Sequence, residues 1–581
     1  LEKIQVPFRV ESQRNVLEDP QIKNLVTLLR FLNDLTSEEK LFEVLHADFL
    51  GVPTVDLYKL FSQPAKQRKV FLSAIETKSL FPGIKDHFSN FLRWQKLSKN
   101  VNLTEFFETV VRESDFLGYL LSQPDSAVRL NRLDGLFSEI KNLVQHHKSF
   151  GLADLIGYFD TLEKHGVAIK EKPLPGIRQA VRLMTAHGAK GLEFDHVFIT
   201  NLFDGHWGNR RIPQLIKLPD LLESSSHEKI DDERRLFYVA MTRARKMAYL
   251  SYPIIGRERR ELLPSQFLGE IKPELKEIGL AEEYEKKLDA DQSALYQPRT
   301  PQNFSVLDKE YLNTLFFKRG LSATAINNYL QCPWRYFYSS LLKIPKAKNK
   351  HQMYGTAVHA GLKDFFDHLK REEGISKEIL LARFAEALKK EPLTEKDFGE
   401  SLDKGRGSLG AYFDYYQNSW RTETINEFRV HNVMFKLSEG EVKLTGSLDK
   451  IEQIDENGEV NVVDYKTGRP KTRNELEGKT QSATGDYKRQ LVFYKLLLDD
   501  LSTQAGHPTA KLKMVSGEID FVEPDQKGNF HKEKFLISDE DVQNLRETIA
   551  DISDQILNLK FKDKTCGDRD CEYCILREKI V

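Results

Sequence analysis

The pattern of apolar and polar positions divides the first part of the chain into one short strand and many helices. Residues 1 to about 45 combine a strand-like start at 4–10 with a stretch whose apolar residues recur at helical spacing. From about 46 to 175 the helical periodicity dominates, and apolar stripes alternate with polar faces. We interpret these stripes as the buried faces of packed helices.

Strand-like runs become frequent in two later parts of the chain. Between 176 and 255 they flank a predicted helix at 231–245, an alternation typical of an α/β unit. Residues 256–318 are charged and poor in motifs, which predicts a linker with helices. From 319 to the end, helices bracket a strand-rich centre at 430–465. We therefore expect a multidomain α/β protein.

Composition limits the possibilities without selecting a function. A length of 581 residues predicts several domains. The 86 Lys and Arg residues cancel the 87 Asp and Glu residues, so any basic surface must be local, as at 257–260 or 343–350. The sequence contains no apolar run of membrane-spanning length and no signal-peptide pattern, which predicts a cytoplasmic protein with no membrane partner. Because the chain opens on Leu1 and not Met, we expect a piece of a longer protein.

The first run with possible chemistry is 183–194, LMTAHGAKGLEF, which predicts a strand, a polar turn with two glycines and a second strand. Glycine permits close approach to the backbone. Thr185 and His187 can offer hydrogen bonds to a phosphate chain, and Glu193 can accept one from a ribose hydroxyl. An ordinary polar loop is the alternative, and this run alone leaves it open.

The second run is 232–245, DERRLFYVAMTRAR, which predicts a helix with an apolar face and two arginines at its C-terminal end. An arginine there can be a surface charge that complements the helix dipole. Alternatively it can reach a γ-phosphate and stabilise the transferred charge.

Together the two runs resemble motifs V and VI of UvrD/Rep-type superfamily-one helicases, and the resemblance extends over residues 1 to about 255. It implies a RecA-like motor subdomain 2A in two segments, 1–45 and 176–255, with 46–175 as a helical 2B insertion. The linker would follow at 256–318.

The same resemblance implies roles for single residues. Arg243 would contact the γ-phosphate, Glu193 the nucleotide ribose, and Thr185 and His187 single-stranded DNA. The chain departs from the family because residues 1–255 contain no G-x-x-x-x-G-K-[ST] phosphate loop. We therefore expect ATP to be used only by a complete motor, with an N-terminal helicase subdomain as partner.

Two predicted strands carry a second constellation, 442–451 (VKLTGSLDKI) and 460–468 (VNVVDYKTG). If the strands are neighbours, Asp449 and Asp464 meet at one end of a sheet, where Mg²⁺ or Mn²⁺ relieves their repulsion. Lys466 follows Asp464 by two residues, so both project from one strand face, and Lys466 can orient or help deprotonate a metal-bound water. A lone D-x-K is common, and a surface salt bridge is the alternative.

Further polar residues surround this pair in the sequence. His359 lies on a predicted amphipathic helix, where a lone histidine is more often structural than a ligand. Gln490 and Tyr494 share a helix face at i, i+4. Glu427 precedes a predicted strand.

This set resembles the RecB-type PD-(D/E)XK nuclease family, which implies an α/β nuclease domain at 319–581. By the resemblance His359, Asp449 and Asp464 bind the metal, and Lys466 is catalytic. Gln490 and Tyr494 would support the active site or the DNA backbone. The role of Glu427 stays open.

The four cysteines lie at the two ends of the same half. Cys332 comes early, and Cys566, Cys571 and Cys574 form C-x4-C-x2-C. Thiolates from both ends of a domain can staple it around a metal, with four unrelated cysteines as the alternative. The arrangement resembles the iron–sulfur cluster of AddB-type nuclease domains, which implies 4Fe–4S. The late spacing departs from the C-x2-C-x5-C of that family, so tetrahedral Zn²⁺ remains an alternative.

Two functions follow from these observations. The first is a helicase–exonuclease fragment that processes DNA ends in recombinational repair, acting on duplex ends and single strands, and its candidate partner is a second protein of a helicase–nuclease complex. The second is a non-catalytic component that binds DNA ends as a scaffold. The intact set of Asp449, Asp464 and Lys466 favours the enzyme.

Overall fold

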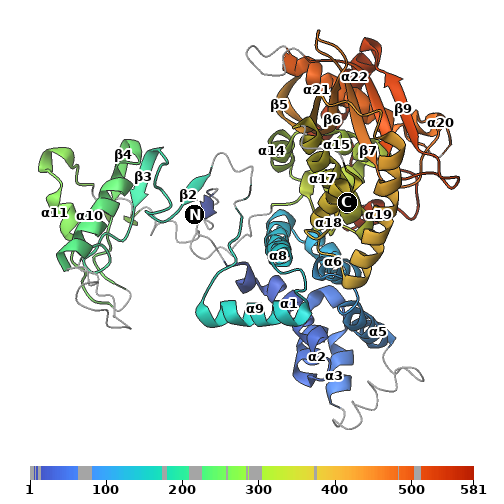
Figure 1. The fold of residues 1–581 in the computed structure, drawn as a ribbon. Coiled ribbons are helices and arrows are strands. Elements are labelled where there is room, and N and C mark those ends of the chain that lie inside the picture. Colours follow the sequence, from blue (N-terminus) through green and yellow to red (C-terminus); the bar gives the residue numbers. More distant parts are fainter. Residues whose placement is uncertain are drawn as a thin grey trace. The chain divides into compact units, whose positions relative to one another are not determined.

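The computed structural model describes residues 6, 8–10, 15–62, 82–172, 174, 180–208, 226–256, 259–279, 281–282, 285–286, 304–371, 376–481, 483–502 and 512–580. Within these ranges, no helix is long and apolar enough to cross a membrane. The chain forms two compact units (Figure 1). The first combines Leu1–Gln13 with Ile177–Gln302, and the second combines Arg14–Gly176 with Asn303–Val581.

The first unit is built on two pairs of parallel strands, in which β1 pairs with β2 and β3 with β4. Helix α10 packs on the β3–β4 pair through a small apolar core that includes Ile199 and Phe237. Because α10 ends at Met241, Arg243 lies in the following turn and Arg245 lies on β4, not on the helix as the sequence suggested. The elements are β1 (Phe8–Val10), β2 (Val181–Leu183), β3 (Phe194–Ile199), α10 (Ser226–Met241), β4 (Ala244–Leu250), α11 (Gln266–Glu270) and η4 (Pro273–Leu275).

A block of helices opens the second unit, in agreement with the helical periodicity. Helix α1 starts where the Asp19 carboxylate accepts hydrogen bonds from the amides of Gln21 and Ile22 and Pro20 takes the first position. Its buried face packs against α2, α5 and α9, so α1 lies with the helical block rather than with the first unit. The elements are η1 (Val16–Glu18), α1 (Pro20–Asn33), α2 (Glu38–Leu45), η2 (Asp48–Leu50), α3 (Thr54–Phe61), α5 (Pro82–Leu97), α6 (Leu103–Glu113), α7 (Phe116–Ser122), α8 (Ser126–His146) and α9 (Leu152–His165).

A five-stranded sheet of order β5-β6-β7-β8-β9 forms the centre of the C-terminal part. All neighbours are antiparallel except β7 and β8, whose parallel pairing requires the crossover helix α21. The predicted strand-rich centre corresponds to β5–β7, whereas β8 and β9 were not predicted. The strands are β5 (Thr424–Leu437), β6 (Gly440–Gln453), β7 (Glu459–Lys466), β8 (Lys513–Phe521) and β9 (His531–Leu536).

Helices cover both faces of this sheet, which makes β7 buried almost throughout. Val463 and Tyr465 of β7 pack into the core of α17, α18 and α19, while Val460 and Val462 pack into the core that includes α21 and α22. The helices are α14 (Lys309–Arg319), α15 (Ala323–Gln331), α16 (Pro333–Arg335), η5 (Tyr336–Leu342), α17 (Lys350–Lys370), α18 (Lys377–Leu388), α19 (Glu395–Tyr416), α20 (Arg473–Leu476), α21 (Asp486–Ser502), α22 (Asp539–Leu557) and α23 (Glu572–Arg577).

Candidate active site and cysteine cluster

Three metal-type ligands meet beside the sheet, each from a different element. The register of β6 and β7, with Lys450 opposite Val463, brings Asp449 next to Asp464. His359 of α17 places Nδ1 3.3 Å from Oδ2 of Asp449. Together with Glu427 of β5, these two residues present ligand atoms that all lie within 4.8 Å of one another. Two carboxylates and an imidazole at this spacing fit one divalent cation that keeps water in its remaining positions.

Glu427 lies within β5 and not before it, and its backbone is strained. Its φ is +50°, the left-handed region that a non-glycine residue adopts at a cost of about 1–2 kcal/mol. The hydroxyl of Ser447 on the neighbouring strand donates to Glu427 Oε2 at 3.1 Å. Such strain persists where the surrounding structure enforces it, and functional sites are a common place for it. Sequence patterns assigned no role to Glu427, because its place near Asp449 depends on the pairing of β5 with β6.

Asp464 lies at the centre of a separate hydrogen-bonded group. Its Oδ1 accepts from the Gln490 amide at 2.8 Å and from the Tyr494 hydroxyl at 3.1 Å, and its Oδ2 lies 2.6 Å from the Lys466 ammonium. The same ammonium donates to Gln490 Oε1 at 3.0 Å. The structure thus brings together Asp464, Lys466, Gln490 and Tyr494, which the sequence grouped, and places Asp464 beside the His359–Glu427–Asp449 set rather than within it.

Burial shapes the protonation of this group. It raises the pKa of the Asp464 carboxyl, although the Lys466 ammonium acts in the opposite sense. For Lys466 burial acts to lower the pKa, but the charges of Asp464 and Asp449 outweigh it and raise the pKa above its usual value. The Lys466 side chain is therefore held as a charged ammonium, which suits it to orient groups and to stabilise negative charge.

The four cysteines converge although Cys332 and Cys574 are 242 residues apart in the sequence. Sulfur–sulfur distances are 3.7 Å for that pair, 3.6 Å for Cys566–Cys574 and 3.9 Å for Cys332–Cys571. A tetrahedral ion with metal–sulfur bonds of about 2.3 Å holds its sulfurs about 3.8 Å apart, so the four thiols as placed fit a single ion. A cubane binds each thiolate to a different iron and would need the sulfurs farther apart.

In the first unit the residues of the two helicase-like runs lie around the turn before β3. Thr185 accepts a hydrogen bond from the Gly188 amide at 3.1 Å, and Thr185, His187 and Glu193 are exposed. Arg243 donates to the carbonyl of Leu192 at 3.1 Å, which brings it beside Glu193. Its guanidinium also donates to the Val239 carbonyl and the Thr242 hydroxyl, so a phosphate would have to replace protein partners.

Both halves of the chain match known families. Residues 1–253 match the UvrD-like helicase C-terminal domain, and residues 320–578 match the PD-(D/E)XK nuclease superfamily. The chain is a UvrD-like helicase C-terminal domain followed by a PD-(D/E)XK nuclease domain. The resemblance seen in the sequence is confirmed, whereas the subdomain boundaries and the roles of single residues remain predictions.

The curated relatives are named either as a combined helicase/nuclease or as a helicase. An ATP-dependent helicase/nuclease of Listeria monocytogenes serotype 4b is 23% identical over 53% of this chain and 29% of its own length. The ATP-dependent DNA helicase Rep of Buchnera aphidicola subsp. Schizaphis graminum is 26% identical over 47% of this chain and 42% of its own. The chain thus spans less than half of either relative. Among solved structures, the crystal structure of SSO0001 aligns with 38% of this chain at 15% identity, with a TM-score of 0.19 that supports no conclusion.

A pocket of about 830 Å³ opens beside the metal-facing residues of the nuclease domain. One wall forms where Gly355 of α17 lies close to Thr467 at the end of β7. The approach is close, because a Cβ on Gly355 would lie 3.1 Å from the Thr467 hydroxyl. Most of the remaining lining residues are polar, and some are basic. They are Asn349, His351, Gln352, Thr356, His359, Ala360, Lys363, Glu427 and Arg429.

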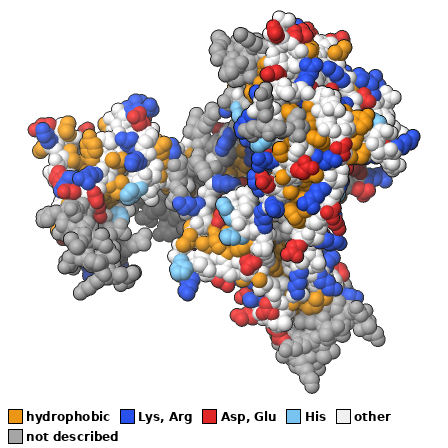
Figure 2. Space-filling model, viewed as in Figure 1, with side chains coloured by type: hydrophobic (Ala, Val, Ile, Leu, Met, Phe, Trp, Pro, Cys, Tyr) orange, Lys and Arg blue, Asp and Glu red, His pale blue; other side chains and the backbone are white. Residues whose placement is uncertain are grey.

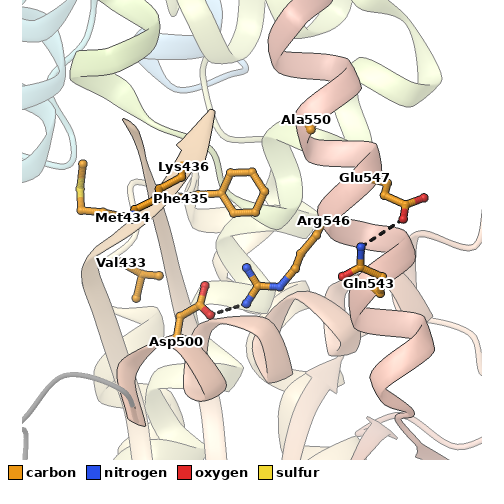
Figure 3. A pocket seen from close by; sticks show the side chains of 9 residues that line it. All are labelled: Val433, Met434, Phe435, Lys436, Asp500, Gln543, Arg546, Glu547 and Ala550. Carbon is orange, nitrogen blue, oxygen red and sulfur yellow. Dashed lines mark hydrogen bonds and ion pairs between the residues drawn. The ribbon is translucent and has the colours of Figure 1, made fainter. Parts of the chain in front are cut away.

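A second hollow of the nuclease domain, about 520 Å³, lies between β5 and α22 (Figure 3). Several of its polar groups pair with one another: Arg546 pairs with Asp500, and the Gln543 amide donates to Glu547 at 3.1 Å. The guanidinium of Arg546 also lies 5.8 Å from the ring centre of Phe435. Because these groups satisfy one another, we assign no ligand to this hollow.

Proposed function

We propose that the nuclease domain is a Mg²⁺-dependent DNA exonuclease that processes DNA ends in recombinational repair. One observation carries the proposal: His359, Glu427 and Asp449 lie together beside the ion pair between the buried Asp464 and Lys466, and His359 and Glu427 line an open pocket. Figure 2 shows acidic and basic side chains interspersed over the visible face, in keeping with the net charge of −1. DNA binding would therefore depend on local basic groups.

Each residue of the site has a proposed role. His359, Glu427 and Asp449, with Asp464 beside them, would hold Mg²⁺ or Mn²⁺, which supplies a Lewis acid that activates water and offsets phosphate charge. Lys466 would orient the attacking water or help to deprotonate it, and would stabilise charge on the phosphate. Gln490 and Tyr494 hold Asp464 and Lys466 in place through their hydrogen bonds.

The helicase domain would contribute only within a complete motor. ATP would then bind with Glu193 at the ribose and Arg243 at the γ-phosphate, and Thr185 and His187 would contact single-stranded DNA. The candidate partners, in the cytoplasm, are an N-terminal motor subdomain that carries the phosphate loop and a second protein of a helicase–nuclease complex. The alternative function is a scaffold that holds DNA ends without cutting them, and the complete set of site residues favours the enzyme over it.

The cysteine cluster would hold a structural metal in the nuclease domain. The sequence favoured 4Fe–4S, but the sulfur–sulfur distances favour a single tetrahedral ion, so we propose Zn²⁺. Elemental analysis of anaerobically purified protein separates the two: one zinc and no visible absorption are expected. About four irons and a brown colour would establish the cluster instead.

Cleavage assays of three variants test the nuclease. Asp464→Ala and Lys466→Ala should each reduce Mg²⁺-dependent cleavage of a labelled linear duplex and of a single strand by at least about 100-fold, as for loss of a preorganised charge. Glu456→Ala, at an exposed position of the turn before β7, is the control and should cut normally. Melting curves establish folding of each variant, and a binding titration should give near wild-type affinity. A wild type that binds ends but never cuts would establish the scaffold, and near wild-type cutting by Asp464→Ala would refute the assigned site.

A further inference from the structure

Among the described residues, one arginine in the active-site pocket has a positive charge that no protein group neutralises. Arg429 follows Glu427 by two residues on β5, and both side chains line the pocket together with His359. Across the ranges that the structure describes, the side chain of Arg429 makes no hydrogen bond and no ion pair. The guanidinium is therefore available to a ligand.

The other strongly basic residue of this pocket is already engaged. The Lys363 ammonium lies 3.0 Å from the Asp367 carboxylate and 3.4 Å from that of Asp364, both on its own helix α17. Arg429 thus differs from Lys363 in having no ion-pair partner in the described part of the chain. A planar guanidinium with several donors also matches the oxygens of a phosphate better than an ammonium does.

We propose that Arg429 binds the phosphate next to the one that is cut. The inference rests on the proposed nuclease function and adds a substrate contact to it. Two residues of a strand span about 7 Å, which is close to the spacing of neighbouring phosphates along a nucleic-acid strand. With the scissile phosphate at His359, Glu427 and Asp449, the guanidinium of Arg429 meets an adjacent phosphate. The contact is to the backbone, so it fixes the position of the cut strand without reading its sequence.

Steady-state cleavage of a single-stranded oligonucleotide tests the contact. Arg429→Ala should raise KM about 10- to 100-fold, the range for a hydrogen bond between charged groups. The kcat should stay nearly unchanged, because the contact exists equally before and during the reaction. The slope of log affinity against log salt should fall by about one. Arg429→Lys should raise KM less than Arg429→Ala does, because lysine keeps the positive charge but lacks the planar guanidinium with its parallel donors.

Lys436→Ala is the matched control, since it removes one exposed positive charge from the same strand at the second hollow. It should leave KM within error of the wild type. An equal rise of KM in Lys436→Ala would show that the effect of Arg429→Ala is a general loss of positive charge, and would refute the specific contact. A fall in kcat at constant KM would also overturn the proposal. Both variants should have the same Tm as the wild type.

A binding experiment with Ca²⁺ in place of Mg²⁺ separates this inference from the nuclease proposal. Oligonucleotides carrying one uncharged methylphosphonate are titrated by fluorescence anisotropy, with the modification moved one position at a time. At one position the modification should weaken oligonucleotide binding by the wild type but not by Arg429→Ala. Additive losses at every position would refute the contact, whether or not the protein cuts DNA. Absence of cleavage by the wild type in Mg²⁺ would refute the nuclease and leave this coupling measurable.

Discussion

Replacing Cys574 by alanine should destabilise the C-terminal end of the nuclease domain by about 5 kcal/mol. Its sulfur lies within 3.7 Å of those of both Cys332 and Cys566, so the substitution would remove a central ligand of the proposed metal. A cross-link between positions 242 residues apart stabilises by about 5 kcal/mol, because it restricts the unfolded chain. Direct contacts across the same junction are weaker. The hydrogen bond that Trp334 Nε1 donates to the Lys564 carbonyl, at 2.9 Å, contributes about 1 kcal/mol.

The effect should extend to the helical block. Helix α23 carries Cys574 and also Glu572, whose carboxylate lies 3.3 Å from Arg112 of α6. Just beyond the helix, the Lys579 ammonium lies 2.8 Å from Asp115. When the cysteine staple is lost, α23 should detach first, and its ion pairs with the α6–α7 region should loosen with it.

Amide hydrogen exchange is the assay, because a multidomain chain has no single unfolding free energy. In Cys574→Ala, or after chelation of the metal, α23 and the α6–α7 junction should exchange much faster, while β7 keeps its protection. Tyr573→Phe is the control. It removes the hydroxyl that accepts hydrogen bonds from Ser339 at 3.2 Å and from Lys346 at 3.3 Å, and should cost about 1–2 kcal/mol. If Cys574→Ala and chelation change the opening free energy of α23 by no more than this control does, the cysteines do not staple the domain.

Two further predictions concern stability. Gly405→Ala should destabilise the α18–α19 packing by about 1–3 kcal/mol, because the new Cβ would lie 2.1 Å from the ring of Phe384. Gly399→Ala is the control on the same helix: its Cβ would meet open space, so thermal melting should show no change or a slight stabilisation. The pKa of Asp525 is held well below its usual value, first by the hydrogen bond to His531. This stabilisation is present above the unfolded pKa and is lost as pH falls through the folded one. The difference in the opening free energy of the β8–β9 hairpin between wild type and Asp525→Asn, measured by amide hydrogen exchange, should therefore shrink on acidification.

The sequence by itself determined what local spacing encodes. The strand-like runs at 442–451 and 460–468 marked β6 and β7, and the two-residue interval put Asp464 and Lys466 on one strand face, in agreement with their 2.6 Å ion pair. The i, i+4 interval likewise put Gln490 and Tyr494 on one helix face, where the Gln490 amide donates to the Tyr494 hydroxyl at 2.6 Å. Such intervals suffice because the geometry of a strand or helix fixes the directions of neighbouring side chains.

Only the tertiary structure decided which distant residues meet. Glu427 joins His359 and Asp449 because β5 pairs with β6 in one register and α17 crosses nearby, and neither fact leaves a trace in local spacing. The approach of Cys332 to Cys574 was expected from the placement of the four cysteines and from the resemblance, but not from local spacing. Helix α1 is a further example. Its apolar stripe predicted that one face is buried, but not which element covers that face, because such a stripe fits any complementary apolar surface. In the structure α1 packs with the helical block.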